Sequence, residues 1–268
     1  MASLSVSPAQ LASALGAVRE TNPLVQCLTN IVVAQWTANS LLSLGAAPAM
    51  VDNVQEAALF ATFASGVLIN TGTPYAETAE AMSLAAASAV KSGTPWVLDP
   101  VAAGGLPWRT EIARQLLGNS APQIIRGNGS EILGLAGGAG GKGVDSTDPA
   151  EAALAAANAI ALEYNTVVAI SGEVDHITDG TRLVRISNGH PLMTQVTGVG
   201  CALGSIMAAF AGVEKDYLVA ASAATATLTV AGDIAAEGNP APGTFAVRLL
   251  DALNTITPAQ LAERVVLS

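Results

Sequence analysis

The most informative segment of the sequence is a glycine-rich turn that leads directly into an apolar helix, VTGVGCALGS from Val196 to Ser205. The first turn of a helix leaves backbone N–H groups without partners, and the helix dipole adds partial positive charge there. Glycines in front of such a helix let an anion approach the backbone, so this turn fits a phosphate group. The candidate catalytic residues are therefore those of the turn: Gly198, Val199, Gly200 and Cys201.

The same turn has two alternative interpretations. Gly198 and Gly200 could simply permit a tight turn, and with Gly204 they also give a variant of the dinucleotide-binding fingerprint. That fingerprint normally lies in the first β-α-β unit and is followed by a strand that ends in an acidic residue, whereas we expect helices to follow here. The sequence has no Walker A motif, which argues against P-loop chemistry.

A second candidate segment, RGNGSE from Arg126 to Glu131, places a cation, an amide and a carboxylate close together. If it is helical, Asn128 and Glu131 share one face, where they could order hydrated Mg²⁺ while Arg126 reaches a phosphate. The alternative is a capped helix, with Asn128 as the N-cap and Glu131 completing a capping box.

Two more segments place polar side chains directly after predicted strands. Asp99 could orient Mg²⁺ or cap the following helix, and the SGEVD segment from Ser171 to Asp175 could hold a nucleotide or start a hairpin. The two histidines, His176 and His190, are far from each other and from both cysteines, so no zinc-ligand spacing exists. A serine hydrolase is also disfavoured, because no G-x-S-x-G motif occurs.

The elements that must position these residues alternate between short β-branched runs and longer alanine-rich amphipathic runs. This alternation predicts an α/β fold in which a central, mostly parallel sheet is flanked by helices on both faces. An Asp179-Gly180 turn predicts a hairpin between its last two strands, with only helices afterwards. We predict strands at 24–28, 48–51, 66–70, 95–99, 123–126, 166–170, 174–178 and 182–186, and helices at 9–20, 34–44, 53–64, 75–91, 109–117, 149–164, 201–212, 216–237 and 244–255.

In open α/β sheets, ligands bind beyond the carboxyl ends of the strands. The candidate residues all follow predicted strands or the glycine turn, so we expect them to meet at one edge of the sheet. The glycine-rich segment from Gly134 to Gly143 could be a lid over a nucleotide or a flexible surface loop. The residues expected at that edge are Asn30, Asn70, Asp99, Arg126, Ser171 and Thr197.

Length and composition favour one compact domain over residues 1–268, with 51% hydrophobic and 12% charged residues. The net charge of −10 argues against nucleic acid or an anionic membrane as a partner. Two separated cysteines fit free thiols in the cytoplasm, and we expect no apolar stretch of about 20 residues that could span a membrane. The scarcity of charge points to surface buried between subunits.

Taken in order, the motifs resemble those of the hydroxyethylthiazole kinase family, within the ribokinase-like fold, over nearly the whole chain. No single motif is specific, but their order along the chain is. The segments that carry the resemblance are CLTN (27–30), GAAPAM (45–50), NTGT (70–73), DPV (99–101), RGN (126–128), SEI (130–132), GVDS (143–146), SGE (171–173), GVGC (198–201) and PGTFAVRLLDAL (242–253).

This resemblance implies Mg²⁺-dependent transfer of the γ-phosphoryl group of ATP to the primary alcohol of 4-methyl-5-(2-hydroxyethyl)thiazole in thiamine salvage. It also implies a homotrimer with sites at subunit interfaces. By residue type, ATP would contact Arg126, Ser171 and Asn128, and Mg²⁺ would be served by Glu131 and Asp99. The substrate would contact Met50, Gly198, Asn30 and Gly72.

Two positions qualify this expectation. Val199 stands where the family usually carries threonine, which is tolerable if the turn binds phosphate through its backbone. Cys201 stands where related sugar kinases place an aspartate base, and its thiol could be a modest base, since a helix N-terminus lowers a cysteine pKa. The alternatives are a related kinase acting on hydroxymethylpyrimidine or another small alcohol, a non-catalytic protein that binds a thiamine precursor, and, more remotely, an NAD(P)-dependent oxidoreductase.

Overall fold

The computed structural model describes residues 6–137 and 149–268, and its centre is one eight-stranded sheet in the order β2-β1-β3-β4-β5-β6-β7-β8. Strands β1 to β6 pair in parallel and β7 and β8 are antiparallel, which confirms the predicted α/β fold with a mostly parallel sheet. The strands are β1 Leu24–Leu28, β2 Ala47–Ala49, β3 Gly66–Asn70, β4 Trp96–Asp99, β5 Ile124–Asn128, β6 Val167–Ser171, β7 Asp175–Thr178 and β8 Leu183–Ile186.

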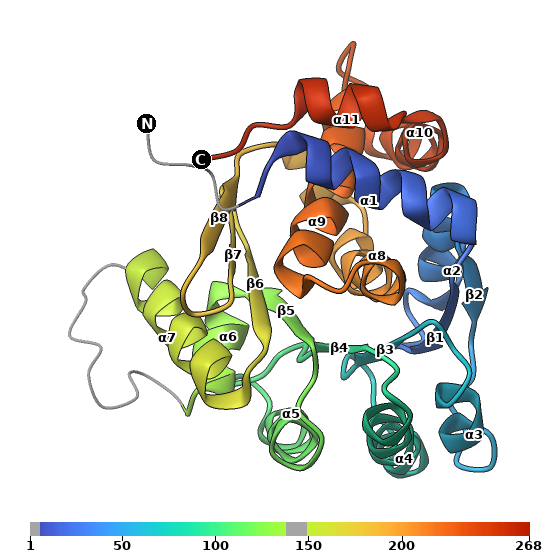
Figure 1. Ribbon diagram of the computed structural model, residues 1–268, viewed down its shortest axis with the longest axis vertical. Helices are drawn as coiled ribbons and strands as arrows, with labels where there is room; N and C mark the ends of the chain where they lie inside the picture. The colour runs from blue at the N-terminus through green and yellow to red at the C-terminus, as the bar shows by residue number, and fades with distance from the viewer. Residues whose placement is uncertain (1–5, 138–148) are drawn as a thin grey trace.

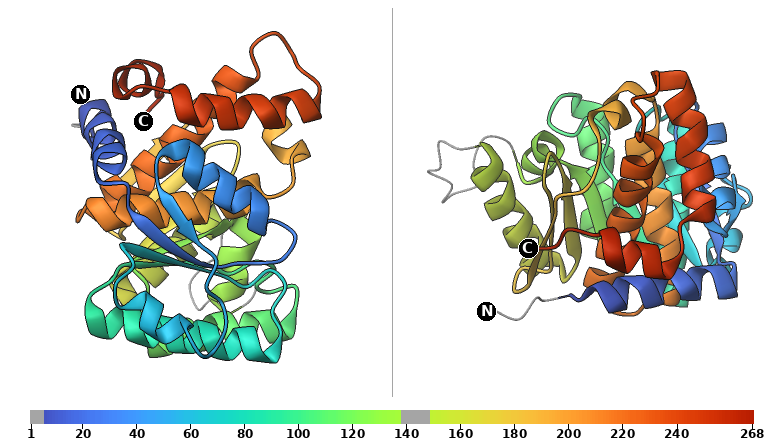
Figure 2. Two further views of the ribbon diagram at one scale, coloured as in Figure 1. Left: turned by 90° about the vertical axis from the view of Figure 1, so that its right-hand side faces the viewer. Right: turned by 90° about the horizontal axis from the view of Figure 1, so that it is seen from above.

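Helices cover both faces of the sheet, as predicted (Figure 1). On one face, α1, α2 and α8 to α11 enclose one hydrophobic core, and on the other face α3 to α7 enclose a second (Figure 2). The helices are α1 Pro8–Thr21, α2 Ala34–Leu44, α3 Ala57–Ala61, α4 Ala76–Ser92, α5 Pro107–Asn119, α6 Gly129–Leu135, α7 Pro149–Tyr164, η1 Pro191–Gln195, α8 Val199–Val213, α9 Tyr217–Ala235, α10 Pro242–Thr255 and α11 Pro258–Arg264.

Most predicted elements are present, and the exceptions have local causes. The helix predicted over 53–64 is shorter, because the Asn53 side chain accepts hydrogen bonds from the backbone N–H groups of Gln55 and Glu56 and holds a turn there instead. Neither η1 nor α11 was predicted from the sequence. The prediction that only helices follow the hairpin is wrong at the C-terminus, where Leu267 forms a β-bridge to Ile186.

Two further expectations concerned an apolar stretch long enough to span a membrane and a glycine-rich lid. The absence of a long apolar stretch was a wrong prediction, because α9 is long and apolar enough to cross a membrane; 89% of its apolar window, however, is buried inside the fold. The possible lid from Gly134 to Gly143 and the GVDS motif lie mostly or wholly outside the described residues.

Helix α8 lies directly on the sheet because small residues line the contact. A methyl group at Gly66 of β3 would overlap the carbonyl oxygen of Ala208, and one at Gly204 would lie 2.9 Å from a methyl carbon of Leu68. Most of α8 is buried between the sheet and the outer helices α1, α2 and α9. This close packing aims the N-terminus of α8 at the carboxyl ends of β3 and β4.

The contact between Gly66 and Ala208 gives a test of this packing. We expect Gly66→Ala to lower the free energy of unfolding by about 1–3 kcal/mol, because the backbone of α8 must move away from β3. The matched control is Gly16→Ala on α1, where an added methyl group meets nothing within 4 Å. That change should raise stability by about 0.5–1 kcal/mol. Chemical denaturation measures both, and equal effects of the two changes would contradict the packing.

Candidate active site at the carboxyl edge of the sheet

The predicted polar residues meet at the carboxyl edge of the sheet. Asn70 pairs in register with Asp99, and Asn128 pairs in register with Ser171. Each of these residues ends its strand, so parallel pairing of β3 with β4 and of β5 with β6 brings the side chains to one edge. The expected convergence of these residues is therefore present in the structure.

The glycine turn forms the N-terminus of α8 above this edge. Gly198 is the N-cap residue with a φ of 92°, a left-handed conformation that favours glycine, and no side chain caps the helix. The backbone N–H groups of Val199, Gly200 and Cys201 occupy the first turn, where a helix supplies no partner within itself. The structure thus has the predicted glycine turn at a helix N-terminus, with backbone N–H groups that no side chain of the described residues caps.

Arg126 lies beside this turn, between two other predicted residues. Its Nη2 donates a hydrogen bond to Ser171 Oγ at 3.0 Å, and its Nη1 lies 3.5 Å from Asp99 Oδ2. A methyl group at Gly200 would stand 3.0 Å from the Arg126 guanidinium, so glycine allows the cation to approach the start of α8. A guanidinium and a helix N-terminus side by side are suited to a phosphate.

Asp99 is the most deeply buried charged group of the cluster. Its side chain is fully buried, and burial raises its pKa to about 6 against the opposing effect of Arg126. Its Oδ2 meets Asn70 and Arg126, whereas its Oδ1 has no partner in the described part of the chain. The Arg126 Nε atom is likewise without a partner there. These two unpaired atoms lie in one cluster beside the start of α8, so both are available to a ligand bound there.

Of the two predicted Mg²⁺ residues, only Asp99 has a carboxylate oxygen without a partner among the residues that the structure describes, which fits a metal site shared with the substrate. No group of three or more His, Cys, Asp or Glu residues that could hold an ion occurs within residues 6–137 and 149–268. Phosphoryl-transfer sites commonly hold Mg²⁺ through one or two carboxylates with water and substrate phosphates. The free Oδ1 of Asp99 meets that requirement.

Glu131 forms the capping box that was the alternative interpretation of its segment. Its Oε2 accepts the Asn128 N–H at 2.9 Å, while Asn128 Oδ1 accepts the Glu131 N–H at 2.9 Å and so caps α6. Its Oε1 accepts the N–H of Ala102 at 3.0 Å, in the turn after Asp99, where Ala102 has a φ of 63°. Glu131 therefore stabilises the turn that carries Asp99 and also lies close enough to raise its pKa.

Cys201 lies at the start of α8 with its thiol facing the amides of the cluster. Burial raises its pKa, the charge of Asp99 adds to this, and hydrogen bonds from Asn70 and Asn30 oppose it. Burial and the charge of Asp99 therefore favour the thiol of Cys201 over its thiolate. Cys27 is fully buried in β1, where burial raises its pKa to about 12.

The predicted substrate residues are placed less uniformly. Asn30 Nδ2 donates to Cys201 Sγ at 3.5 Å, and a methyl group at Gly72 would lie 2.7 Å from that same Nδ2. Gly72 thus makes room for Asn30. Met50 is 40% exposed and follows β2, the edge strand of the sheet, away from the Asp99 cluster.

Two buried residues matter to the cluster although the sequence assigned them no role. Asn70 joins Asn30 to Asp99, and its position at the end of a predicted strand was the available signal. Asp175, at the start of β7, accepts the N–H of Gly172 at 3.0 Å and steadies the turn after Ser171, with its pKa raised to about 6 by burial. From the sequence, Asp175 belonged to the SGEVD segment, which could hold a nucleotide or start a hairpin, and its burial was not expected.

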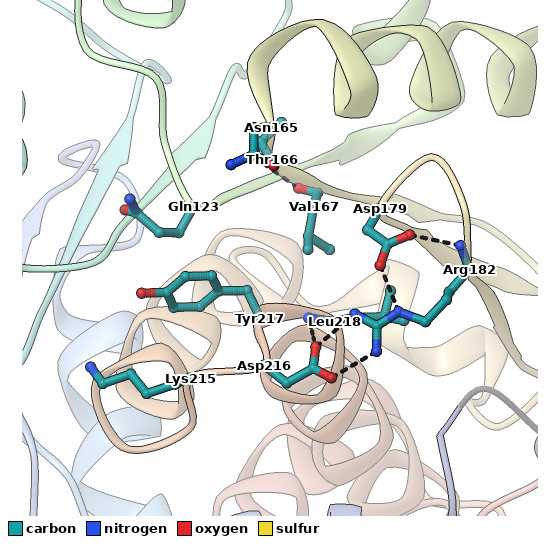
Figure 3. A pocket seen from close by; sticks show the side chains of 10 residues that line it. All are labelled: Gln123, Asn165, Thr166, Val167, Asp179, Arg182, Lys215, Asp216, Tyr217 and Leu218. Atoms are coloured by element: carbon teal, nitrogen blue, oxygen red, sulfur yellow. Dashed lines mark hydrogen bonds and ion pairs between the residues drawn. The ribbon is translucent and has the colours of Figure 1, made fainter.

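A pocket of about 450 Å³ lies at the opposite edge of the sheet, where β5 and β6 begin (Figure 3). Arg182 is held there by Asp179 at 2.7 Å and by both oxygens of Asp216, at 2.7 and 3.0 Å. These ion pairs lower the pKa of Asp216, and hydrogen bonds from Arg182 and Thr181 lower that of Asp179 to about 2 although burial opposes this. Arg182, Asp179 and Asp216 satisfy one another's charges in this pocket, which lies away from the candidate site.

The raised pKa of Asp99 predicts a change in stability with pH. The folded protein binds this proton more tightly than the unfolded chain does, so ionising Asp99 costs stability as pH rises from about 4 through 6. We expect Asp99→Asn to raise the free energy of unfolding by up to about 3 kcal/mol near pH 7.5 and to have little effect near pH 4. Denaturation in metal-free buffer measures this, with exposed Asp251→Asn as a control. A loss of stability near pH 7.5 would contradict the assignment.

The sequence was also compared with those of known protein families and curated proteins. The model of the hydroxyethylthiazole kinase family matches residues 15–259. The hydroxyethylthiazole kinase of Clavibacter sepedonicus is 59% identical, over 92% of this chain and 90% of its own length. That of Cutibacterium acnes is 54% identical, over 95% of this chain and 92% of its own length.

Solved structures agree with these sequence matches. The hydroxyethylthiazole kinase structure of Pyrococcus horikoshii OT3 superposes with a TM-score of 0.89 at 35% identity, covering 96% of this chain and 98% of that one. A pyridoxal kinase from Staphylococcus aureus, at 17% identity and a TM-score of 0.58, covers 78% of this chain and 86% of its own and shares the fold. The family match and the curated relatives together lead to one conclusion: the chain belongs to the hydroxyethylthiazole kinase family.

Proposed function

We propose that the protein transfers the γ-phosphoryl group of ATP to the primary hydroxyl of 4-methyl-5-(2-hydroxyethyl)thiazole, a reaction of thiamine salvage. The observation that carries this proposal is the meeting of three features at one edge of the sheet. They are the uncapped N-terminus of α8, the Arg126 guanidinium beside it, and the buried Asp99 carboxylate with a free oxygen. Together they match the requirements of a triphosphate and its cation.

In the proposed reaction the substrate oxygen forms a bond to the γ-phosphorus, and the bond from that phosphorus to the β–γ bridging oxygen breaks, releasing ADP. The hydroxyl proton passes to an oxygen of the transferred phosphoryl group and from there to solvent. Negative charge on the transferred group is stabilised by the N–H groups of Val199, Gly200 and Cys201 and by Arg126. Ser171 and Asn128 would contact ATP. Because such transition states are loose and depend mainly on positioning, a strong base is not required.

Mg²⁺ would be held by Asp99, supported by Glu131, and would neutralise charge on the β- and γ-phosphates. The thiazole would lie near Asn30, Gly72, Gly198 and Met50. The thiol of Cys201 would act through contact with the substrate rather than as a thiolate, since its pKa is raised. Val199 is compatible with this scheme, because the turn offers phosphate its backbone.

We also propose that the chain is a single domain over residues 1–268, works in the cytoplasm and forms a homotrimer whose interfaces lie at the active sites. The single sheet supports the first statement. Large apolar side chains remain exposed around the β2 edge, and burying them between subunits would remove them from water. They are Ile31, Val32, Met50, Leu59 and Phe63.

The test of function is release of ADP from ATP and Mg²⁺ with the hydroxyethylthiazole, run beside hydroxymethylpyrimidine and ribose, with products identified by mass. Phosphorylated thiazole supports the proposal. Phosphorylation of only another alcohol replaces the substrate, and thiazole binding without transfer would identify a non-catalytic binding protein.

The roles of Arg126 and Cys201 make a comparison within this assay. We expect Arg126→Ala to lower kcat/KM by about 100-fold or more, because it removes positive charge at the transferred group. Cys201→Ala should cost about 10-fold or less, because the thiol is protonated and supplies only contact. Steady-state kinetics with both substrates varied measures the two losses, and the reverse order would make Cys201 the more important group.

The proposed trimer has its own test. Wild-type protein should have the mass of three chains by light scattering after size exclusion. We expect Leu59→Glu, which places a charge on the exposed surface of α3 beside β2, to shift the protein towards smaller species. The control is Val90→Glu on α4, also at an exposed apolar side chain, which should remain trimeric. A wild-type monomer, or equal dissociation of both variants, contradicts the proposed interface.

A further inference from the structure

Asn70 lies at the centre of the candidate site, but the proposed mechanism gives it no role. It ends β3, and its side chain is fully buried. Its Oδ1 accepts hydrogen bonds from Asn30 Nδ2 and from the N–H of Gly72, each at 3.0 Å. Its Nδ2 donates to Asp99 Oδ2 at 2.7 Å. The Asn70 amide therefore contacts both Asn30, which is expected beside the alcohol, and Asp99, which is expected beside the phosphates and Mg²⁺.

The pattern of donors and acceptors leaves little freedom in this chain of groups. Asn30 can donate from Nδ2 to both Asn70 and Cys201, because an amide nitrogen carries two hydrogens. Asp99 Oδ2 receives Asn70 on one side and lies 3.5 Å from Arg126 on the other. Asp99 is therefore held with Oδ1 free, and the Asn30 amide is held with its nitrogen towards Cys201.

We propose that Asn70 is a positioning residue for phosphoryl transfer, which sets the orientation of Asn30 relative to Asp99 beneath the N-terminus of α8. This inference rests on the proposed kinase function. Both polar atoms of the Asn70 side chain already bond to protein groups, and the side chain is fully buried, so Asn70 acts through its neighbours. Loss of the amide would let the Asn30 side chain and the Asp99 carboxylate rotate independently, in a reaction that depends on the relative placement of two substrates.

A purely structural role would have different consequences. If Asn70 only shapes the turn through Gly72, its loss lowers stability, because buried partners are left without hydrogen bonds, and the remaining folded protein keeps its kcat. A positioning role lowers kcat in folded protein while KM for ATP changes little, because Arg126 and Ser171 do not contact Asn70. A loss of kcat in folded protein therefore indicates positioning, whereas a loss of stability with unchanged kcat indicates a structural role.

The experiment is a double-mutant cycle with wild type, Asn70→Ala, Asn30→Ala and the double variant, assayed for kcat and for KM of each substrate. Thermal denaturation and calorimetric binding of ATP establish that each variant is folded. The matched control is Thr178→Val, which removes a buried hydroxyl that bonds to Asn158 and Arg182 at the opposite edge of the sheet. It should lower the melting temperature and leave kcat unchanged.

We expect Asn70→Ala to lower kcat by about 10- to 100-fold with KM and affinity for ATP within about threefold of wild type. Because Asn70 acts partly through Asn30, the double variant should lose at least about fivefold less than the product of the two single losses. Multiplicative losses, or a kcat for folded Asn70→Ala equal to wild type, overturn the inference.

The same experiment keeps the inference separate from the proposed function. A wild type that phosphorylates a different alcohol overturns the proposed substrate, and the cycle is then measured with that alcohol against the same criteria. A wild type that binds ATP but transfers phosphate to none of the alcohols overturns both proposals. An active wild type with unaltered Asn70→Ala overturns only the role of Asn70.

Discussion

The close contact between α8 and the sheet is the constraint on which the rest of the structure depends. Gly66 and Gly204 remove the side chains that would separate α8 from β3 and β4. The N-terminus of α8 therefore lies over Asp99 and Arg126. Larger side chains at this contact would move the start of α8, with its glycine turn, away from Asp99 and Arg126.

The close packing also accounts for the electrostatics of the site. Asp99 is fully buried beneath α8, so its pKa is raised even beside Arg126. The ionised carboxylate therefore lowers the free energy of unfolding at neutral pH. Burial likewise keeps the thiol of Cys201 protonated. The raised pKa values of Asp99 and Cys201 are both consistent with a reaction that depends on the placement of its substrates and on charge stabilisation rather than on a strong base.

Local signals accounted for most of the fold. The strands and long helices followed from their periodicity, and the Asp179-Gly180 turn from its residue types. The short helix α11 was missed although Thr257, Pro258 and Gln260 form a capping box with proline in the first turn. The bridge at Leu267 was missed because it depends on pairing with β8. The late start of the helix at Ala57–Ala61 was missed because the turn held by Asn53 competes with it.

By itself, the sequence determined the α/β class, the glycine turn at the start of α8 and the convergence of Asp99, Arg126 and Ser171, because residues at the ends of parallel strands must share an edge. Only the tertiary structure decided that Asn70 joins Asn30 to Asp99, that Glu131 bonds to the turn at Ala102, and that burial raises the pKa of Cys201. These properties depend on distances and burial between segments far apart in the chain, and no local pattern of residues encodes them.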